Sequence, residues 1–528
     1  MNNKQKYTAL DTDVLIAGCG QAGLSAAYEV LKQNKKVILV SKNDECASNY
    51  VLGFNAPVNE NDSVELYEND TLQGGLNIGN KNLARALSEG SLEAVELLEK
   101  QGFIFDKDNG EYNLLKPLGC SCARLVHIEN HTGRTTVSKY WDFVNQMGAQ
   151  VLSNSMIVDL LVKDKKIIGA KVINKQTGEI YIVKCKSVIL ATGGIHIAKD
   201  STYPKFMTGD GYALAYKAGA RLVDMEFIQF EPCRCIYPKK LGISTTLLAK
   251  GGQIKNNKGE RFLLKHYQNE GLVSKDMLAR LIALEVQNGN GSQHSGVYLD
   301  LTLLDPKEII ENHSLYYQRF IKEGIDLTKD IIEVGPAAHS FMGGIVIDEQ
   351  CRTDIEGLFA AGEVAGGIHG ANRVGGNAGS EIYVFGKIAG NSAAKYCQQC
   401  SQAFSVECNY ADTVFEKGNT THQDYNETKE NILEIMHKYM GPARSEDGML
   451  SAQQLLKDIL KQIQDSKPTD TNALISKYEV ENLALVCTLS VKAAIKRKES
   501  RGVHYRTDYP EVDKAFCNSL CVSVYDED

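Results

Sequence analysis

The sequence predicts a doubly wound α/β domain of the Rossmann type, interrupted by an inserted capping domain and followed by a helical region. Three observations indicate this arrangement. A glycine-rich turn near the N-terminus joins a strand pattern to a helix pattern. From Ile236 to about Gly335 strand-like segments mix with helices, and glycine clusters of the cofactor-binding type return at Gly343. After Tyr396 the sequence is polar and has helical spacing.

The length of 528 residues indicates more than one domain, because a single hydrophobic core stops growing well before this size. We expect the first part of the Rossmann-like domain in residues 1–235 and an α+β capping domain in residues 236–335. The second part of the Rossmann-like domain should then span residues 336–400, and the C-terminal helical region residues 401–528.

The composition excludes several classes of function. Contents of 43% hydrophobic and 23% charged residues are ordinary for a globular protein. A net charge of -8 without a basic block argues against nucleic-acid binding. The longest apolar runs have only strand length, so we expect no membrane insertion. The N-terminus lacks the apolar core of a signal peptide, which predicts a cytoplasmic protein.

Fourteen cysteines occur without a secretory signal, so we expect reduced thiols rather than disulfides. Their spacing matches neither ferredoxin clusters nor a haem attachment motif, and we predict no metal site. Most should be small buried hydrophobes. A redox role for Cys120, Cys122, Cys233 and Cys235 is the weaker alternative and stays open.

The N-terminal turn has the residues that a dinucleotide-binding βαβ unit requires. A buried strand over 11–18 leads into a helix over 22–33 and then into a second strand. Gly18 permits the tight turn, Gly20 lets the backbone approach a pyrophosphate, and Gly23 allows the helix to pack on the strand. The N-terminus of this helix offers its N–H groups to the phosphates.

Further elements follow in order along the chain. Residues 65–101 and 275–287 have helical spacing. Strand patterns occur at 36–40, 151–154, 167–173, 180–183 and 187–190. The polar stretch 417–426 predicts a flexible surface loop.

Four motifs identify the family that this chain resembles. They are His339-Ser-Phe-Met-Gly-Gly, Ala361-Gly-Glu363, His369-Gly-Ala-Asn-Arg373 and Ser500-Arg-Gly-Val-His-Tyr-Arg506. They resemble motifs of the flavoprotein family of succinate dehydrogenases, fumarate reductases, L-aspartate oxidases and adenylylsulfate reductases. The resemblance runs from about residue 11 to 512, and it implies FAD as the cofactor.

The resemblance also implies which residues contact FAD. These belong to the first glycine turn, the Ser-Lys after the second strand, a second glycine turn, and an acidic residue at a late strand. The implied cofactor-binding residues are Gly18, Gly20, Gln21, Ala22, Gly23, Ser41, Lys42, Ser48, Asn49, Ala191, Thr192, Gly193, Gly194, Asp210, Gly362, Glu363, Asn377 and Ser380. In membrane-bound members a histidine tethers the flavin, and Asn49 stands in its place here. We therefore predict non-covalent FAD, which favours a reductase.

The substrate site that the resemblance implies is partly changed. His339 and Arg373 are retained, and they should hold a substrate carboxylate. Glu231 replaces a carboxylate-binding histidine, and Thr245 lies where the family has a Thr-Glu pair. Lys275 replaces the arginine that transfers a proton.

Two of these changes affect the expected chemistry. Glu231 would be an anion and would repel a second substrate carboxylate, so a four-carbon dicarboxylate is less expected. Lys275 can deliver a proton if burial or a nearby cation makes its ammonium group more acidic. The alternative is that Lys275 is a solvated lysine at a helix start, although a helix N-terminus disfavours a cation.

These inferences predict an FAD-dependent oxidoreductase that reduces a carbon–carbon double bond conjugated to a carboxylate or a carbonyl. Hydride would pass from flavin N5 to one carbon, and Lys275 would protonate the other. Electrons would come from a separate iron–sulfur or flavodoxin-like donor. Two alternatives stay open: an amino-acid oxidase resembling L-aspartate oxidase, and a non-catalytic FAD electron-transfer protein.

Overall fold

The computed structural model describes residues 7–129, 131–400 and 418–525. At its centre is a five-stranded sheet in which neighbouring strands are parallel, in the order β20-β12-β2-β3-β8. The strands are β2 (Val14–Ala17), β3 (Val37–Val40), β8 (Gln150–Leu152), β12 (Ser187–Leu190) and β20 (Leu358–Ala360). This is the doubly wound arrangement that the sequence predicts.

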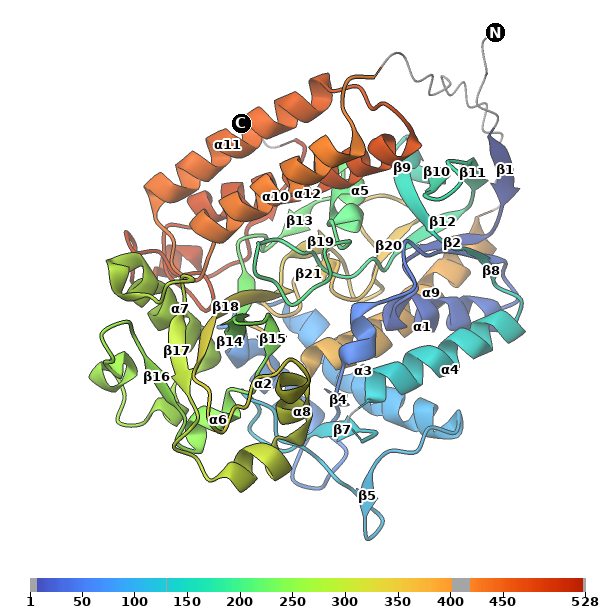
Figure 1. Cartoon of the computed structure of the whole chain (residues 1–528). Coiled ribbons are helices and arrows are strands. Elements are labelled where there is room, and N and C mark those ends of the chain that lie inside the picture. Colours follow the sequence, from blue (N-terminus) through green and yellow to red (C-terminus); the bar gives the residue numbers. More distant parts are fainter. Residues whose placement is uncertain (1–6, 130, 401–417, 526–528) are drawn as a thin grey trace.

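The middle strands of the central sheet are buried along their whole length. They are buried because helices cover the sheet. Helix α1 (Gln21–Lys32) packs against α9 (Asn377–Gln399) and α4 (Thr132–Gln146) (Figure 1). Gly390 makes the contact between α1 and α9 close, since a Cβ at this position would lie 2.4 Å from the carbonyl oxygen of Ala26.

The predicted strand over 11–18 is in fact two strands that belong to different sheets. β1 (Thr8–Asp11) pairs with β11 (Ile180–Lys184), whereas β2 joins the central sheet. The break falls at Asp13, whose carboxylate accepts hydrogen bonds from the backbone N–H of Lys36 and from Nζ of Lys186. These bonds hold the chain where it passes between the sheets.

Smaller sheets surround this core. The first has the order β1-β11-β10-β9, and the second has the order β21-β19-β13-β22. Their remaining strands are β9 (Ser155–Lys163), β10 (Lys166–Asn174), β13 (Leu222–Val223), β19 (Gly344–Val346), β21 (Ala365–Gly366) and β22 (Cys521–Val522). β4 (Gly53–Asn55) pairs with the distant strand β7 (Leu125–His127), and β5 (Lys107–Asp108) forms a hairpin with β6 (Glu111–Tyr112).

The helical stretch predicted over 65–101 is two helices, α2 (Val64–Gly74) and α3 (Lys81–Lys100). Leu76 and Asn77 between them have φ values of 52° and 58°, which no right-handed helix accommodates. The side chain of Asn80 then accepts hydrogen bonds from the first N–H groups of α3 and starts it anew.

The capping domain has a sheet of its own, in the order β15-β14-β18-β17-β16. Its strands are β14 (Ile228–Tyr237), β15 (Leu241–Gly242), β16 (Gln253–Lys255), β17 (Val297–Asp300) and β18 (Ile332–Phe341). A separate hydrophobic cluster, with members from Cys233 to Val334, fills this part of the molecule. The proposed limits of 236 and 335 therefore lie within strands β14 and β18, which continue into the Rossmann-like domain.

Among the described residues, the α-helices of the capping domain are α6 (Thr246–Ala249), α7 (Lys275–Glu285) and α8 (Ser314–Lys322). The helical spacing predicted over 275–287 corresponds to α7. Regular α-helical geometry stops at Val286–Asn290, where Gly289 has a φ of 77°.

The C-terminal region contributes α10 (His422–Tyr439), α11 (Glu446–Asp465) and α12 (Thr471–Lys496), which lie together in Figure 1. Helix α12 packs against α10, α11 and α5 (Asp210–Lys217). The loop prediction for 417–426 is wrong from His422 onward, because Thr421 and Asp424 cap one another's backbone and begin α10; Lys417 lies outside the described residues. None of the described helices is both long and apolar enough to cross a membrane.

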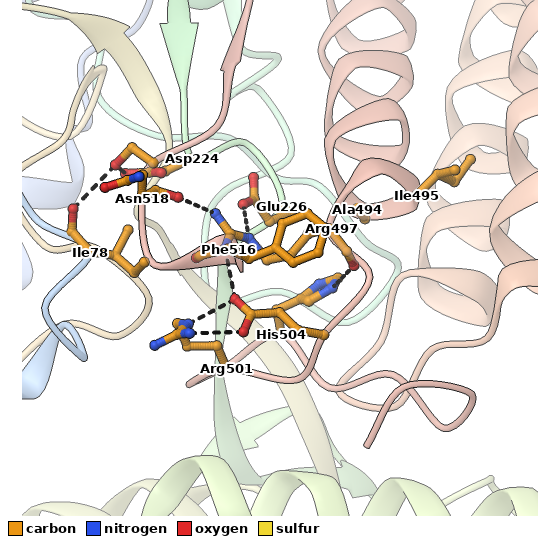
Figure 2. Close-up of polar contacts among 12 residues, drawn as sticks. Ile78, Asp224, Glu226, Ala494, Ile495, Arg497, Arg501, His504, Phe516 and Asn518 are labelled. Carbon is orange, nitrogen blue, oxygen red and sulfur yellow. Dashed lines mark hydrogen bonds and ion pairs between the residues drawn. The ribbon is translucent and has the colours of Figure 1, made fainter. Parts of the chain in front are cut away.

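A buried ion-pair cluster ties the end of α12 to the start of the capping domain (Figure 2). The guanidinium group of Arg497 lies 2.5 Å from the carboxylate of Glu226 and 2.8 Å from that of Glu499, and all three side chains are fully buried. Arg497 also donates to the backbone carbonyls of Phe516 and Asn518. One side chain thus connects a helix, the segment before β14 and the C-terminal tail.

We expect the substitution Arg497→Met to lower the stability of the protein by about 3–5 kcal/mol, because it leaves Glu226 buried without its counterion. Urea denaturation followed by circular dichroism measures this loss as a shift of the midpoint. Arg352→Met is the matched control, because its ion pair with Asp348 is exposed and should be worth about 1 kcal/mol or less. Equal midpoints for the two variants would contradict a stabilising role of the cluster.

Candidate active site

A cavity of about 1660 Å³ extends from the central sheet to the capping domain. Residues that follow β2, β3, β12 and β20 line it, as do residues of β14, α7 and α8. Because the carboxyl ends of parallel strands meet at one edge of a sheet, these loops converge there. The position matches that of a nucleotide site in a doubly wound fold.

The first glycine turn can accommodate only glycine at its critical positions. Gly18 has a φ of 107°, and a Cβ there would lie 2.2 Å from the carbonyl oxygen of Ala191. A Cβ at Gly23 would lie 2.0 Å from the carbonyl oxygen of Gly18, which is the close helix packing that the sequence predicts. Gly20 caps α1 without a side chain, and Ser48 accepts a bond from the N–H of Gln21.

We expect Gly18→Ala to abolish FAD binding, because the new methyl group meets the backbone and an alanine at this φ is strained. The ratio of flavin to protein absorbance after purification measures the loss. Gly148→Ala is the matched control: its φ is 86°, but nothing lies within 4 Å of the added Cβ. Normal FAD content in the Gly18→Ala protein would exclude the proposed turn as the phosphate site.

The second glycine turn, residues 191–194, and the acidic residue Glu363 line the same cavity. A Cβ at Gly194 would lie 2.6 Å from the carboxylate of Glu363. The hydroxyl of Tyr203 donates to Glu363 at 2.6 Å, and burial raises the pKa of Glu363 to about 7. Thr192 lines the cavity, but its hydroxyl is buried and lies toward α5, where a Cβ at Gly211 would come within 2.2 Å of it. The carboxylate of Glu363 fits the hydroxyl-rich chain of FAD, whose ribityl and ribose oxygens both donate and accept hydrogen bonds.

Two of the predicted cofactor residues, Lys42 and Asp210, are bound to other side chains of the protein. Nζ of Lys42 lies 2.8 Å from the carboxylate of Asp210 and 2.9 Å from that of Glu479. Asn482 donates a further hydrogen bond to Asp210. Lys42 and Asp210 line the cavity, but their charges are satisfied by each other and by α12. We therefore propose that they hold α12 against the cofactor site instead of binding FAD directly.

Five other predicted cofactor residues do not line the cavity: Gln21, Gly23, Asn49, Asn377 and Ser380. The side chains of Asn377 and Ser380 are buried behind the start of α9, where both accept a hydrogen bond from the hydroxyl of Tyr67. Gly376, Ala378 and Gly379 line the cavity in their place. A helix period sends successive side chains to different faces, so a linear motif does not distinguish these positions.

Among the described residues, His339 is the sole histidine that lines the cavity, and Asn49 stands where the resemblance implies the tethering histidine of membrane-bound members. We expect acid precipitation of the protein to release all FAD into the supernatant, because no covalent link is made at Asn49. Absorbance of the supernatant and pellet measures the distribution. Yellow colour that stays with the pellet would reveal a covalent bond to another side chain.

The opposite end of the cavity is formed by β14 and β18. Nδ1 of His339 lies 3.0 Å from the hydroxyl of Thr202. Burial, followed by the positive charges of Arg373, Lys275 and Arg234, lowers the pKa of His339 to about 3. At neutral pH this imidazole is therefore uncharged, and it acts as a hydrogen-bonding group rather than as a cation.

Arg373 is held by a neighbouring amide. Its Nη2 donates to Oε1 of Gln229 at 3.0 Å, and Nε2 of Gln229 donates to Asn372 and to the carbonyl oxygen of Arg373. Arg373 lines the cavity and is only half-buried, so its side chain is accessible to a ligand there. Its Nε is buried and has no hydrogen-bond partner among the described residues.

The sequence-based expectation for Glu231 and Lys275 is wrong in its electrostatics. Oε2 of Glu231 lies 2.7 Å from Nζ of Lys275, and the Lys275 side chain is 43% exposed. The lysine is therefore paired with an anion and lacks the deep burial that the sequence argument considered. Because the two charges offset each other, Glu231 does not present a free anion that would repel a second carboxylate.

Comparison with known proteins agrees with this geometry. The family model for the FAD binding domain matches residues 13–378, and the model for the C-terminal domain of fumarate reductase flavoproteins matches residues 429–528. The chain belongs to the flavoprotein family of succinate dehydrogenases, fumarate reductases and L-aspartate oxidases. FAD is therefore the cofactor of this flavoprotein.

Individual relatives match this flavoprotein over nearly its whole length. It is 33% identical to one of the chains of the fumarate reductase (CoM/CoB) of Methanothermobacter marburgensis, over 97% of both sequences. It is 31% identical to L-aspartate oxidase of Acinetobacter baylyi, over 95% of this chain and 94% of the relative. The structure of Sdh1 from Mycobacterium smegmatis in complex with UQ1 superimposes with a TM-score of 0.88 at 31% identity, over 98% and 93% of the chains. The predicted fold class is confirmed.

The cysteine pairs of this flavoprotein lie outside the cavity. Cys233 and Cys235 are buried in the core of the capping domain, and Cys120 and Cys122 do not line the site either. Burial raises the pKa of Cys120 and of Cys235 to about 11, which makes both poor nucleophiles. The structure thus favours small buried hydrophobes over redox groups.

Sequence reasoning missed several residues that line the substrate end. Thr245, which it did include, lines the cavity at the start of α6. The missed residues are Gln229, Arg234, Tyr203, Tyr316 and Arg319. Arg234 lies only three positions after Glu231, so its nearness to a predicted site residue was a signal in the sequence.

Proposed function

We propose that this flavoprotein reduces a carbon–carbon double bond conjugated to a carboxylate or a carbonyl. The observation that carries this proposal is the convergence of Arg373, His339 and Lys275 on one end of the FAD cavity. A cation and a neutral imidazole suit an enoate as the substrate. The carboxylate of an enoate gains negative charge as hydride arrives at the double bond, and both groups can stabilise that charge.

When bound, FAD supplies the hydride at N5 of its flavin ring. Arg373 then holds the carboxylate of the substrate and stabilises the negative charge that develops on it. His339 orients the same group through a hydrogen bond, since its pKa of about 3 keeps it neutral. Lys275 delivers a proton to the carbon that does not receive hydride, and Glu231 fixes the position of this ammonium group.

The capping domain supplies Lys275 and Glu231 from different elements, α7 and β14. Its closure over the Rossmann-like domain would exclude water from the reacting atoms. Electrons would come from a separate iron–sulfur or flavodoxin-like protein, since the chain has one dinucleotide fingerprint and no ferredoxin motif.

A panel of acceptors tests this function. The holoenzyme is reduced with dithionite in the absence of oxygen, and acrylate, crotonate, cinnamate, fumarate and enones are added separately. Return of the oxidised flavin spectrum with at least one acceptor, at a rate that saturates with its concentration, is the expected result. Reduced flavin that none of them reoxidises would instead favour a non-catalytic electron-transfer protein. Turnover with NADH and no other donor would contradict the separate donor.

The second candidate is oxidation of an amino acid. It is supported by the identity of 31% to an L-aspartate oxidase over 95% of this chain. Peroxide release with L-aspartate and oxygen would establish this activity. The Glu231–Lys275 pair distinguishes this chain from the family pattern of histidine and arginine, and it favours a different substrate.

A further inference from the structure

Two short links join the capping domain to the Rossmann-like domain. One runs from β13 through residues 224–227 to β14, and the other runs from β18 through residues 342–343 to β19. Because β13 pairs with β19 and β14 pairs with β18, the two links lie side by side. They also touch, since a Cβ at Gly343 would lie 2.5 Å from the carbonyl oxygen of Asp224. We call these two links the hinge, because any movement of the capping domain must bend the chain here.

The C-terminal tail, residues 516–522, adds a further strand beside the hinge. β22 in this tail pairs with β13 on the side away from β19. Next to this pairing, the N–H group of Asp224 donates to the carbonyl oxygen of Leu520 at 3.0 Å. The hydroxyl oxygen of Ser519 lies 2.9 Å from the carboxyl group of Asp224 and 3.3 Å from the carbonyl oxygen of Ile78. The tail therefore bonds to the first link through both the backbone and the side chain of Asp224.

The C-terminal region holds the same link a second time, through Glu226. The carboxylate of Glu226 pairs with Arg497, which also donates to two carbonyl oxygens of the tail (Figure 2). The guanidinium carbon of Arg497 lies 4.9 Å from the centre of the Phe227 ring. Arg444 donates to the carbonyl oxygen of Glu226 at 2.7 Å. Asp224 and Glu226 thus connect the hinge to the tail and to the end of α12.

The carboxyl group of Asp224 fits its position best when it carries a proton. Burial, followed by the negative charge of Glu226, raises the pKa of Asp224 to about 8. The Ser519 hydroxyl and the charge of Arg497 oppose this rise without cancelling it. The hydroxyl of Ser519 also has one hydrogen but two neighbouring acceptors, Asp224 and the carbonyl group of Ile78. A protonated Asp224 satisfies both contacts, because it donates to Ser519 while Ser519 donates to Ile78.

We propose that the C-terminal tail is a latch that locks the hinge of the capping domain through Asp224. With the latch in place, the tail and α12 hold the first link and prevent it from bending. Release separates Ser519 and Leu520 from Asp224, admits water to its carboxyl group, and lets the hinge bend. Locking takes up one proton from water onto Asp224, and release returns it. The inference goes beyond the proposed function, because it holds for any reaction at the flavin.

The proton count fixes how the latch responds to pH. An exposed aspartate has a pKa of about 4, whereas burial raises the pKa of Asp224 in the locked state to about 8. Between these two values the locked state binds one proton that the released state lacks. Each unit of rising pH in this window therefore favours release about tenfold. The latch should be tight in mildly acidic solution and should loosen as the pH rises.

Hydrogen exchange of the oxidised holoenzyme, read by mass spectrometry, tests the latch. The N–H group of Asp224 reports the latch, because its acceptor is Leu520 in the tail. The N–H group of Met342 reports the hinge, because it donates to Phe227 on the other link at 3.1 Å. Asp224→Asn is the decisive variant. Asparagine tolerates the left-handed φ of 60° at this position, can still donate to Ser519, and cannot ionise.

The expected result is a ratio that depends on pH. The protection of both N–H groups in the wild type, divided by that in Asp224→Asn at the same pH, should fall about tenfold for each unit from about pH 5.5 to 7.5. The ratio removes the effect of pH on chemical exchange itself. The N–H groups of β17, inside the capping domain, should show no such fall, because the domain moves as one body. Asp513→Asn is the matched control and should behave as the wild type, because Asp513 is exposed and precedes the tail.

Ser519→Ala provides a second test that leaves Asp224 unaltered. It removes the side-chain hydrogen bond between the tail and Asp224, so the protection of both N–H groups should fall about tenfold at about pH 6. A wild-type ratio that stays constant over the range of pH would overturn the proposal. So would unchanged protection in Ser519→Ala, or a Met342 N–H group that stays protected while that of Asp224 loses its protection.

Discussion

Replacing Arg373 with glutamine should lower kcat/KM for an enoate about a thousand-fold while the protein keeps its FAD. Arg373 holds the substrate carboxylate in the proposed mechanism, and the loss of a buried charged contact costs about 4 kcal/mol. Its side chain lines the cavity, and its guanidinium group donates a hydrogen bond to Gln229, a neutral amide. Stopped-flow reoxidation of the dithionite-reduced flavin by crotonate measures the effect.

Two controls identify the cause of that loss. Ferricyanide needs no carboxylate site, so it should reoxidise the reduced Arg373→Gln protein at the wild-type rate. Arg373→Lys should restore little, because an ammonium group cannot form the two parallel bonds of a guanidinium group. An Arg373→Gln protein that reduces enoates within ten-fold of the wild-type rate would show that Arg373 has a structural role.

The second prediction with a large effect concerns the transfer of a proton from Lys275 to the substrate. Lys275→Met should lower kcat about a thousand-fold, because general acid catalysis contributes about 100- to 10,000-fold and methionine has no proton to give. FAD content should not change, since Lys275 belongs to the capping domain and is partly exposed. Single-turnover reoxidation by a saturating enoate measures the step directly.

The family residue at this position provides the matched control. Lys275→Arg should keep activity within about ten-fold of the wild type, because a guanidinium group can also pair with Glu231 and donate a proton. Reoxidation by ferricyanide, which adds no proton to carbon, should be the same in all three proteins. Near-normal enoate reduction by Lys275→Met would refute the assignment of Lys275 as the acid.

Much of the fold follows from local sequence. The first turn requires glycine at Gly18 and Gly23, where the surrounding backbone leaves no room for a side chain. Continuous apolar strands such as Val14–Ala17 predict a sheet covered on both faces. The contact at Gly23 is with Gly18, and an apolar run is a local feature, so the linear pattern is enough to find them, although the backbone that Gly18 meets belongs to Ala191.

Errors arise where a position depends on its place in three dimensions. The pattern over residues 11–18 is continuous and predicts one strand, but Asp13 bonds to Lys186, far along the chain. Asn377 and Ser380 belong to the cofactor motif, yet the rotation of α9 turns them away from the cavity. Neither the distant partner nor the helix rotation is visible in a linear motif.

The family, the cofactor and the positions of His339 and Arg373 could all be predicted before any fold was known, because short motifs with fixed spacing carry them. How the substituted residues act together could not. Folding brings Lys275 on α7 to Glu231 on β14, which cancels a charge that the sequence leaves free. A bulge in β14 also turns Arg234 into the cavity. Electrostatic energy depends on distances between side chains, and those distances exist only once the capping domain has folded.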